Sequence, residues 1–473
     1  MALRIAQSIV KGIRPSGRRP GLRDPILPGE LGADRFAPGY TLVINRETMP
    51  DEVIQHITSI DYEDNEELYD QMTIRLEGFF EDKELGQDIP IPEWVQKSTL
   101  FSEGNIVWVY MGYGTGGQEL IGGAEIVRRE FDYGDNPSCQ IICYEPLHRM
   151  ANEFAEKAIT YKGMRSSDIV KKIARKSTYS GEIGALFNVE FIERLPVFTP
   201  KAEVQKRGES DFAFLKRMAD VRGWHLYTKF DTKKNKFNLF YGPDVDKQQE
   251  TFRYEYRPKG NLLPEDQLLS FKPTINTIDQ NTEVDITTID EKRKKGVKSS
   301  QKYQGFADGK LITKRKFSGD NTDFKNKELQ NPTRYRFEIF GVSKKIIANR
   351  PFKDEQEVKK FIINWARETI KNFIVGNGRV AGNERLQSRS AHIFMGLGDT
   401  FSGTETKPAK WYLTKVKHKI DSSGYSTTFD ARKVIDWIPN DDIRATVPAT
   451  QAERERSKKA GRITSIVQSG LGG

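Results

Sequence analysis

The most informative stretch of this chain lies near its middle and runs Glu209-Ser210-Asp211-Phe212-Ala213-Phe214-Leu215-Lys216-Arg217-Met218-Ala219. Short polar side chains open it, as they commonly do at the start of a helix. Apolar residues then recur at helical spacing, namely Phe212, Leu215, Met218 and Ala219. Gly223 is placed to end the helix in a left-handed conformation. The stretch therefore predicts an amphipathic helix that packs one face against a core.

The residues around this helix predict a mixed α/β domain over 146–262. A strand follows at Trp224-His225-Leu226-Tyr227, and Lys236–Tyr241 is its expected hairpin partner. A second helix is expected upstream, where Ser166 or Ser167 can cap a face formed by Ile169, Val170, Ile173 and Ala174.

Short runs of alternating apolar and polar residues lie on both sides of this domain and predict strands. Before it they are Tyr40–Asn45, Ile57–Tyr62, Met72–Glu77, Ile106–Met111, Ala124–Arg129 and Gln140–Tyr144. After it they are Leu268–Phe271, Glu283–Thr287, Ala391–Met395, Trp411–Val416 and Tyr425–Asp430. The predicted class is mainly β with α+β insertions, and the first set suggests a small antiparallel barrel or sandwich.

The segments between and beyond these strands are polar and basic. Residues 291–332 are expected to form a long loop, followed by a strand at Tyr335–Phe340. Asp354 and Glu357 form a capping box for a helix with Val358, Phe361, Ile362, Trp365 and Phe373 on its inner face. Residues 1–37 are rich in Gly, Pro and Arg and predict an extended basic arm, and 441–473 predict a polar tail.

Composition excludes several classes of protein. The 473 residues suggest about three domains, and the formal net charge is 75 − 66 = +9. No apolar run approaches the roughly 20 residues of a membrane helix, and no secretory signal is evident. Cys139 and Cys143, the only cysteines, are expected to share one face of a strand as buried thiols. A membrane protein, a disulfide scaffold and a wholly disordered chain are therefore excluded.

The charge is segregated along the chain. Residues 51–90 carry 13 acids and two basic residues, whereas 291–350 carry 17 basic residues and six acids. A basic chain suggests nucleic acid as a partner. The alternative, which we favour, is that patches of opposite sign meet one another, within a subunit or between copies.

The sequence yields no catalytic, cofactor or metal residue. Gly112–Gly117 fits G-x-G-x-x-G, but Ile121–Val127 is expected to be a strand rather than a helix, so a hairpin loop is favoured over a dinucleotide site. The five histidines are widely separated in sequence, so a metal site is not expected.

The acids of 51–90 could include a glycosidase pair, but outward positions on strands favour a solvated or interface face. Trp224 and Tyr227 are expected in the core. A structural subunit, by contrast, needs no such residues and only requires faces that are complementary to those of its neighbours.

The first-quoted stretch resembles the E-S-D-x-x-F-L-x-R-L-A element of contractile-tail baseplate hubs, a family that includes phage late-control D proteins and the N-terminal part of the type VI spike protein VgrG. Other stretches agree in order along residues 40–435: Met111-Gly112-Tyr113 with Gly122–Ile126, Tyr144–Leu147, Ser167–Ala174, Gly396–Gly403, Tyr412–His418, and Gly424–Phe429 with Arg432. The sequence departs from the family at Ser388-Arg389-Ser390, where a Pro-Gly turn is expected, and at Asp285-Ile286-Thr287.

The resemblance implies a division of the chain. Its parts are an arm at 1–37, a first tube-like barrel at 38–145, the mixed α/β domain at 146–262, a second tube-like barrel at 263–290 and 375–440, a basic insertion with a strand and a capped helix at 291–374, and a tail at 441–473.

The resemblance also implies a structural protein of the virion tail baseplate, assembled in the host cytoplasm, without enzymatic activity or cofactor. A homotrimeric ring would adapt the sixfold tail tube to a threefold spike and keep a central channel open for DNA, without specific DNA binding or membrane insertion. Its partners would be the tube, spike, tape-measure and inner baseplate proteins, while spike and wall-cutting activities would belong to other proteins. A nucleic-acid-binding protein and a tail-associated peptidoglycan hydrolase remain the alternatives.

Two hypotheses follow for the unusual segments. The acidic 51–90 face is expected at a subunit contact or along the channel, where like charge would keep DNA from adhering. The arm and the tail are expected to order only on neighbouring subunits.

Overall fold

The computed structural model describes residues 38–434, apart from 83–85, 114–116, 182–183, 186, 191–202, 221–223, 235, 243–250, 257–266, 279–282, 291–294, 303–343, 349–370 and 407. Its contacts divide the chain into two compact units. The first comprises Met1–Asn276 and Lys371–Val434, and the second comprises Thr277–Ile370 and Ile435–Gly473. The finer six-part division stays a prediction.

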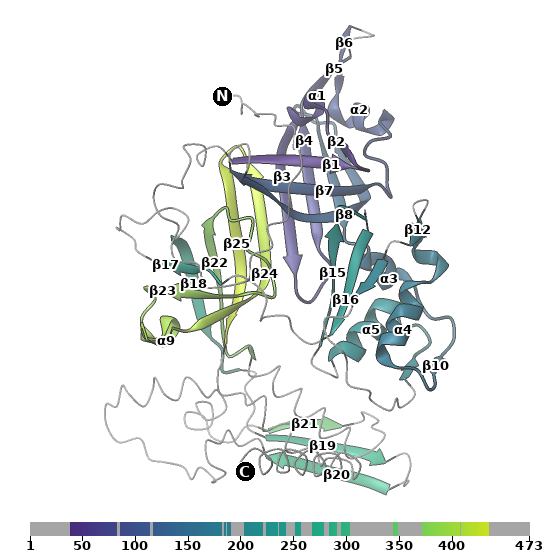
Figure 1. The fold of residues 1–473 in the computed structure, drawn as a ribbon, viewed down its shortest axis with the longest axis vertical. Helices are drawn as coiled ribbons and strands as arrows, with labels where there is room; N and C mark the ends of the chain where they lie inside the picture. The colour runs from purple at the N-terminus through teal and green to yellow at the C-terminus, as the bar shows by residue number, and fades with distance from the viewer. Residues whose placement is uncertain are drawn as a thin grey trace, which may run out of the picture. The chain divides into compact units, whose positions relative to one another are not determined.

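One large sheet organises the first unit (Figure 1). Its strands follow the order β18-β22-β25-β24-β3-β4-β9-β8-β7-β1-β2, with β23 and β17 attached beside β24. Their bounds are β1 Pro38–Ile44, β2 Glu47–Thr48, β3 Ile57–Asn65, β4 Gln71–Glu77, β7 Ile106–Tyr113, β8 Gly117–Asp132, β9 Ser138–Tyr144, β17 Arg253–Glu255, β18 Leu268–Ile275, β22 Ile374–Ala381, β23 Ala391–Met395, β24 Lys410–Asp421 and β25 Gly424–Lys433. The mainly β class is thereby confirmed.

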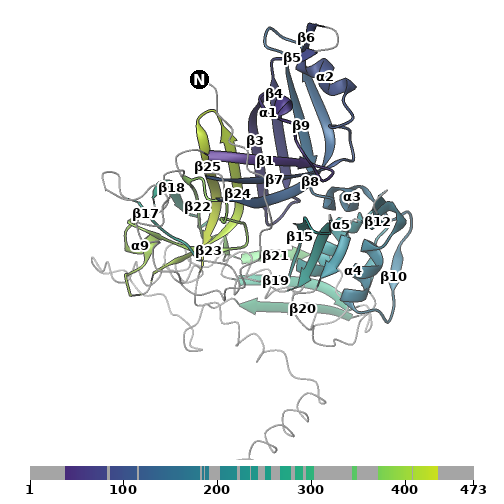
Figure 2. The same ribbon diagram turned by 45° about the horizontal axis from the view of Figure 1, so that its top comes forward.

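The N-terminal half of this sheet closes over an aliphatic core. Alternate residues of its strands point inward, among them Leu42, Ile60, Ile74, Val109 and Ile141, all fully buried. Short elements flank the core: α1 Asp51–Ile54, α2 Ile91–Lys97 and the hairpin of β5 Phe79–Asp82 with β6 Gln87–Pro90, which extends beyond the sheet (Figure 2).

Both cysteines lie in this core, as predicted from their spacing. Cys139 and Cys143 are buried free thiols on the same face of β9. Burial raises the pKa of Cys139 to about 12, so the thiol stays protonated and behaves as a small apolar group.

The C-terminal half of the sheet has an aromatic core instead. Phe271 lies 4.8 Å from Trp411 and 5.2 Å from Phe394, and Phe394 lies 5.0 Å from Phe429, measured between ring centroids. A short helix, α9 Asp399–Ser402, follows β23. An isolated parallel bridge joins Glu255 to Gln267, the residue before β18. Among the described strands, however, the pairing forms no closed barrel, so the two predicted barrels are two halves of one sheet joined by β24 and β3.

The mixed α/β part follows β9 directly and is as predicted in outline. It contains α3 Leu147–Asn152, β10 Ile159–Tyr161, α4 Ser166–Ala174, a 3-10 turn at Ser177–Tyr179, β11 Ser180–Gly181, β12 Gly184–Ala185, β13 Phe187–Glu190, β14 Glu203–Gln205, α5 Asp211–Asp220, β15 His225–Asp231 and β16 Lys236–Gly242. The hairpin of β15 and β16 is confirmed, and α4 and α5 pack their apolar faces into its core. Trp224 packs on Tyr241 and Tyr227 on Phe240, which confirms their core role.

The predicted cap of α4 is wrong. Arg165 occupies the N-cap position with extended backbone and makes no side-chain capping bond, and Ser166 is the first helical residue. Packing of the buried face, at Ile169, Val170, Ile173 and Ala174, therefore positions this helix.

The second unit contains a three-stranded sheet with the order β20-β19-β21. Its strands are β19 Glu283–Asp290, β20 Lys295–Lys302 and β21 Lys344–Ala348. The expected loop at 291–332 is therefore wrong at its start, because β20 pairs antiparallel with β19. The arm, the tail, Gly223, the strand at 335–340 and the helix after Asp354 lie outside the described residues.

One glycine sets how β15 approaches β8, and it yields a first prediction. A Cβ at Gly123 would lie 2.6 Å from Phe230 Cγ, and Phe230 also packs on Trp108 at 5.0 Å. Gly123→Ala should lower the free energy of unfolding by about 1–3 kcal/mol, since Phe230 must move. Urea denaturation would measure this, with Gly134→Ala as control because a Cβ there meets only Asp132 at 3.5 Å. Equal stability of the two variants would contradict the close approach.

Candidate functional site

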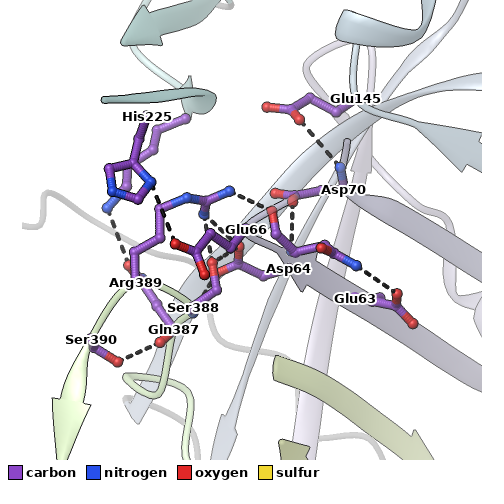
Figure 3. Close-up of polar contacts among 12 residues, drawn as sticks. Glu63, Asp64, Glu66, Asp70, Glu145, His225, Gln387, Ser388, Arg389 and Ser390 are labelled. Atoms are coloured by element: carbon purple, nitrogen blue, oxygen red, sulfur yellow. Dashed lines mark hydrogen bonds and ion pairs between the residues drawn. The ribbon is translucent and has the colours of Figure 1, made fainter. Parts of the chain in front are cut away.

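The most unusual polar feature among the described residues is a cluster of carboxylates where β15 of the mixed α/β part meets the main sheet (Figure 3). Three segments meet there: the end of β3 with the turn that follows, residues 387–390 before β23, and the corner after β9. The acids are Asp64, Glu66, Asp70 and Glu145, and the cations are Arg389 and Arg432. We call this set the junction cluster.

Arg389 and Asp64 form its central ion pair. Arg389 Nη1 donates to Asp64 Oδ1 at 2.9 Å, and Ser388 donates to the same carboxylate through its N–H at 2.8 Å and its hydroxyl at 2.5 Å. Arg389 also donates to the carbonyl of Asn65. Burial raises the pKa of Asp64, but Arg389 and the Ser388 hydrogen bonds outweigh it and hold the pKa below its usual value.

The backbone around Arg389 is arranged to deliver this side chain. Arg389 has φ of 64°, a left-handed conformation that a residue with a Cβ adopts rarely, and its N–H donates to Leu413 O at 2.8 Å. Its guanidinium carbon lies 4.5 Å from the ring centroid of Tyr227 in β15. Ser388-Arg389-Ser390, which stands where the family resemblance predicts a Pro-Gly turn, is thus the segment that supplies the Arg389 cation to the cluster.

Asp70 and Glu145 form the second part of the cluster. Asp70 accepts from Tyr62 Oη at 2.9 Å and from the Asn65 N–H at 3.1 Å, while Glu145 Oε2 accepts from the Asp70 N–H at 3.2 Å. Burial and the nearby Asp64 charge raise the pKa of Asp70 to about 7. Burial and Asp70 raise the pKa of Glu145 well above its usual value. These carboxyls therefore resist ionisation.

Glu66 connects the turn to β24 and β25. Its Oε1 atom accepts from Tyr412 Oη and from Arg432 Nη2, both at 3.1 Å, and lies 3.5 Å from His225 Nδ1 of β15. The Arg432 guanidinium lies over the Tyr412 ring at 4.3 Å. Side chains from the main sheet and from the mixed α/β part thus meet at one carboxylate.

The expectation that the acids of 51–90 point outward is wrong for this group. Glu66 and Asp70 are each 7% exposed, and the side chain of Asp64 is 14% exposed. Further along β3, Glu63 and Asp61 pair across the strand with Lys415 and Lys417 of β24, at 2.7 and 3.2 Å. Part of the acidic block therefore meets opposite charge within the subunit, although the lysines belong to β24 and not to the basic segment 291–350.

The E-S-D stretch also has a structural role. Asp211 is fully buried and accepts from Lys176 Nζ at 2.6 Å, Tyr179 Oη at 2.5 Å and Gln205 Nε2 at 2.8 Å. Ser210 Oγ accepts from the Ala213 N–H, which confirms a polar start to the helix. Glu209 pairs with Arg217 at 2.7 Å. The motif fixes α5 against its neighbours rather than offering groups to a ligand.

Two histidines that share hydrogen bonds with hydroxyls are also structural. His392 Nδ1 accepts from the Phe252 N–H at 3.0 Å, so Nε2 carries the proton and donates to Ser390 Oγ at 2.6 Å. A serine nucleophile needs the opposite tautomer, with a free nitrogen facing its hydroxyl. Burial lowers the pKa of His392 to about 3 and that of His418 to about 4, so both stay neutral.

Two candidates from the sequence remain, the glycine-rich motif and a metal site. Gly112 lies at the end of β7 and Gly117 begins β8, which pairs antiparallel with β7 and continues to Asp132 where a dinucleotide site needs a helix. Within the described part of the chain, no group of three or more His, Cys, Asp or Glu side chains could hold a metal ion. None of the described helices has the length and apolarity needed to cross a membrane.

The main sheet with its α/β insertion forms a fold that is also found in solved tail proteins. The chain is similar to the 43 kDa tail protein of prophage MuSo2 from Shewanella oneidensis, at 11% identity and a TM-score of 0.53, covering 83% of this chain and 98% of that one. It is also similar to a tail protein from Neisseria meningitidis MC58, at 10% identity and a TM-score of 0.53, covering 83% and 96%. No family model and no curated protein matches the sequence. The chain therefore shares the fold of these two tail proteins, in line with the resemblance seen in the sequence.

A second prediction concerns the buried Asp211. Asp211→Ala removes the acceptor of Lys176, Tyr179 and Gln205 and should lower the free energy of unfolding by about 3–5 kcal/mol, since it leaves a charge without its partner. Lys216→Ala, which affects an exposed pair with Asp220 at 3.7 Å, should change it by less than about 1 kcal/mol. Thermal unfolding would compare them, and equal effects would argue against a structural role for the motif.

A third prediction concerns Arg389. Arg389→Met should lower the free energy of unfolding by about 3–5 kcal/mol, because Asp64 keeps its charge without a cation. Adding Asp64→Asn should recover part of the loss, since the amide has no charge to compensate. Arg385→Met is the control, because its pair with Glu119 is exposed. A double variant no more stable than Arg389→Met would contradict the coupling.

Proposed function

We propose that this chain is a structural baseplate hub protein of a phage tail or related injection machine, and not an enzyme. Three copies would form a ring that adapts a sixfold tail tube to a threefold spike and keeps a channel open. The observation that carries the proposal is the fold shared with two tail proteins over 83% of this chain. Its partners would be the tube, spike, tape-measure and inner baseplate proteins. The baseplate would be assembled in the host cytoplasm.

The arrangement of the sheet supports a ring of this symmetry. Each chain contributes two antiparallel halves joined through β24 and β3, so three chains would present six such halves. Among the described strands, β18 pairs along its length only with β22, and a single bridge at Gln267 joins its start to Glu255, so the rest of its other edge is available for strand addition. Such edges suit contacts between subunits.

The acids that remain at the surface suit the expected channel or subunit contact. Glu67, Glu81 and Asp88 are exposed, unlike the acids of the junction cluster. In a channel, these carboxylates would repel the DNA backbone and prevent adhesion. The basic charge elsewhere in the chain would then serve neighbouring proteins rather than DNA.

A fourth prediction tests the assembly. Light scattering of the purified chain should give the mass of a trimer, and electron microscopy should show a threefold ring with a central opening. A DNA mobility shift at low salt should show little binding, and Glu67→Lys with Glu81→Lys and Asp88→Lys should increase it. Glu130→Lys, on an exposed position of β8, is the matched control. A monomer at all concentrations, or tight DNA binding by the unaltered chain, would contradict the proposal.

A further inference from the structure

The junction cluster contains more buried acids than cations. Arg389 compensates Asp64 and Arg432 compensates Glu66, at 2.9 and 3.1 Å. Asp70 and Glu145 are both buried, at 7% and 3% exposure, and neither has a guanidinium or ammonium group within salt-bridge distance among the described contacts. Two adjacent buried carboxylates without a cation are costly, so one of them favours the neutral form.

Charged and titratable groups from several elements surround this pair. The groups that face it are Tyr62 and Asp64 of β3, Glu66 of the turn, Glu125 of β8, His148 and Arg149 of α3, His225 and Lys229 of β15, Arg389, and Tyr412 and Arg432 of β24 and β25. Arg149 is paired with Glu125, and burial lowers the pKa of His148, so neither adds a free positive charge at neutral pH.

The hydrogen bonds indicate which carboxyl holds the proton. Asp70 accepts two donors, the Tyr62 hydroxyl and the Asn65 N–H, and both favour its ionised form. From the described residues, the Glu145 carboxyl accepts one hydrogen bond, from the Asp70 N–H to Oε2 at 3.2 Å. Glu145 is therefore the better site for a proton.

Glu145 also lies where the chain leaves the main sheet. It follows β9 and precedes α3, and its N–H donates to Asp70 O at 2.9 Å. From the other side, β15 reaches the same cluster through His225 and Tyr227. The charge on Glu145 thus bears directly on the contact between the mixed α/β part and the sheet.

We propose that Glu145 holds a proton at neutral pH and that its release to solvent loosens the mixed α/β part, from α3 to β15, from the main sheet. The ionised Glu145 would repel the Asp70 carboxylate beside it, and the corner between β9 and α3 would move away to hydrate the charge. The inference does not depend on the hub function, since it concerns only contacts within the first unit.

The direction of the pH effect follows from the raised pKa values. A carboxyl whose pKa is higher in the folded than in the unfolded chain stabilises the fold below its unfolded value, and this contribution is lost as the pH rises through the folded value. For Asp70 that window runs from about 4 to about 7, and Glu145, also raised, acts in the same direction. Asp64, whose pKa is lowered, acts oppositely and only under acidic conditions.

Hydrogen exchange of the full chain at about pH 6 and about pH 9 tests the proposal, with times scaled for the intrinsic exchange rate. Protection of Leu147–Asn152 and His225–Asp231, relative to Gln71–Glu77, should fall about tenfold or more at the higher pH. Glu145→Gln, which imitates the neutral acid, should leave only the smaller fall caused by Asp70 and keep protection at the lower pH unchanged. Glu130→Gln, a surface acid of β8, is the matched control and should behave as the unaltered chain.

Three results would overturn the proposal: constant relative protection in the unaltered chain, the same fall in Glu145→Gln, or loss of protection by this variant at the lower pH. If Glu145→Gln does not fold, infrared spectra of Asp70→Asn still decide, because Glu145 is then the member of the buried pair that can hold a proton. The carbonyl band of a neutral carboxyl group should be present near pH 7 and disappear as the pH rises. Absence of that band near pH 7 would equally refute it.

Discussion

The antiparallel pairing of β24 with β3 is the contact on which the first unit depends, since it joins two stretches separated by more than 300 residues. Without it the sheet would be two smaller sheets, each with an additional open edge. The pair is reinforced on one side by Lys415 with Glu63 and Lys417 with Asp61, and at its end by Arg389 with Asp64. The exposed lysine pairs add little, so the buried guanidinium is the stronger constraint on register.

Most strands and the two helices at Ser166 and Asp211 were predictable, because each depends on a local pattern of apolar residues. The spacing of Cys139 and Cys143 likewise placed both thiols in the core. The joining of the two halves was not predictable, because β24 and β3 carry no signal of their partnership beyond alternation. The cap of α4 was missed because its packing, rather than Ser166 or Ser167, determines where it begins.

The junction cluster left only indirect signals in the sequence. Acids of the 51–90 block were expected to face solvent, because alternation along β3 cannot identify which face a distant cation covers. The one local sign was Ser388-Arg389-Ser390, a departure from the expected turn, whose left-handed Arg389 is needed to reach Asp64. Glu145 lies in the stretch Tyr144–Leu147 that resembles the family, but nothing in the sequence indicated its burial, which results from how β9, α3 and the turn before β4 converge.

The E-S-D stretch, whose resemblance first suggested a tail protein, thus serves to stabilise the fold. Asp211 satisfies three donors inside the mixed α/β part, and Glu209 with Arg217 closes its surface. Residues with this role specify where α5 lies and offer no group to a substrate. Because the same holds for His392 with Ser390 and for Arg389 with Asp64, the polar groups of the described core act on shape and register. A protein built in this way can act through its surfaces and edges, as the proposed ring between a tube and a spike would require.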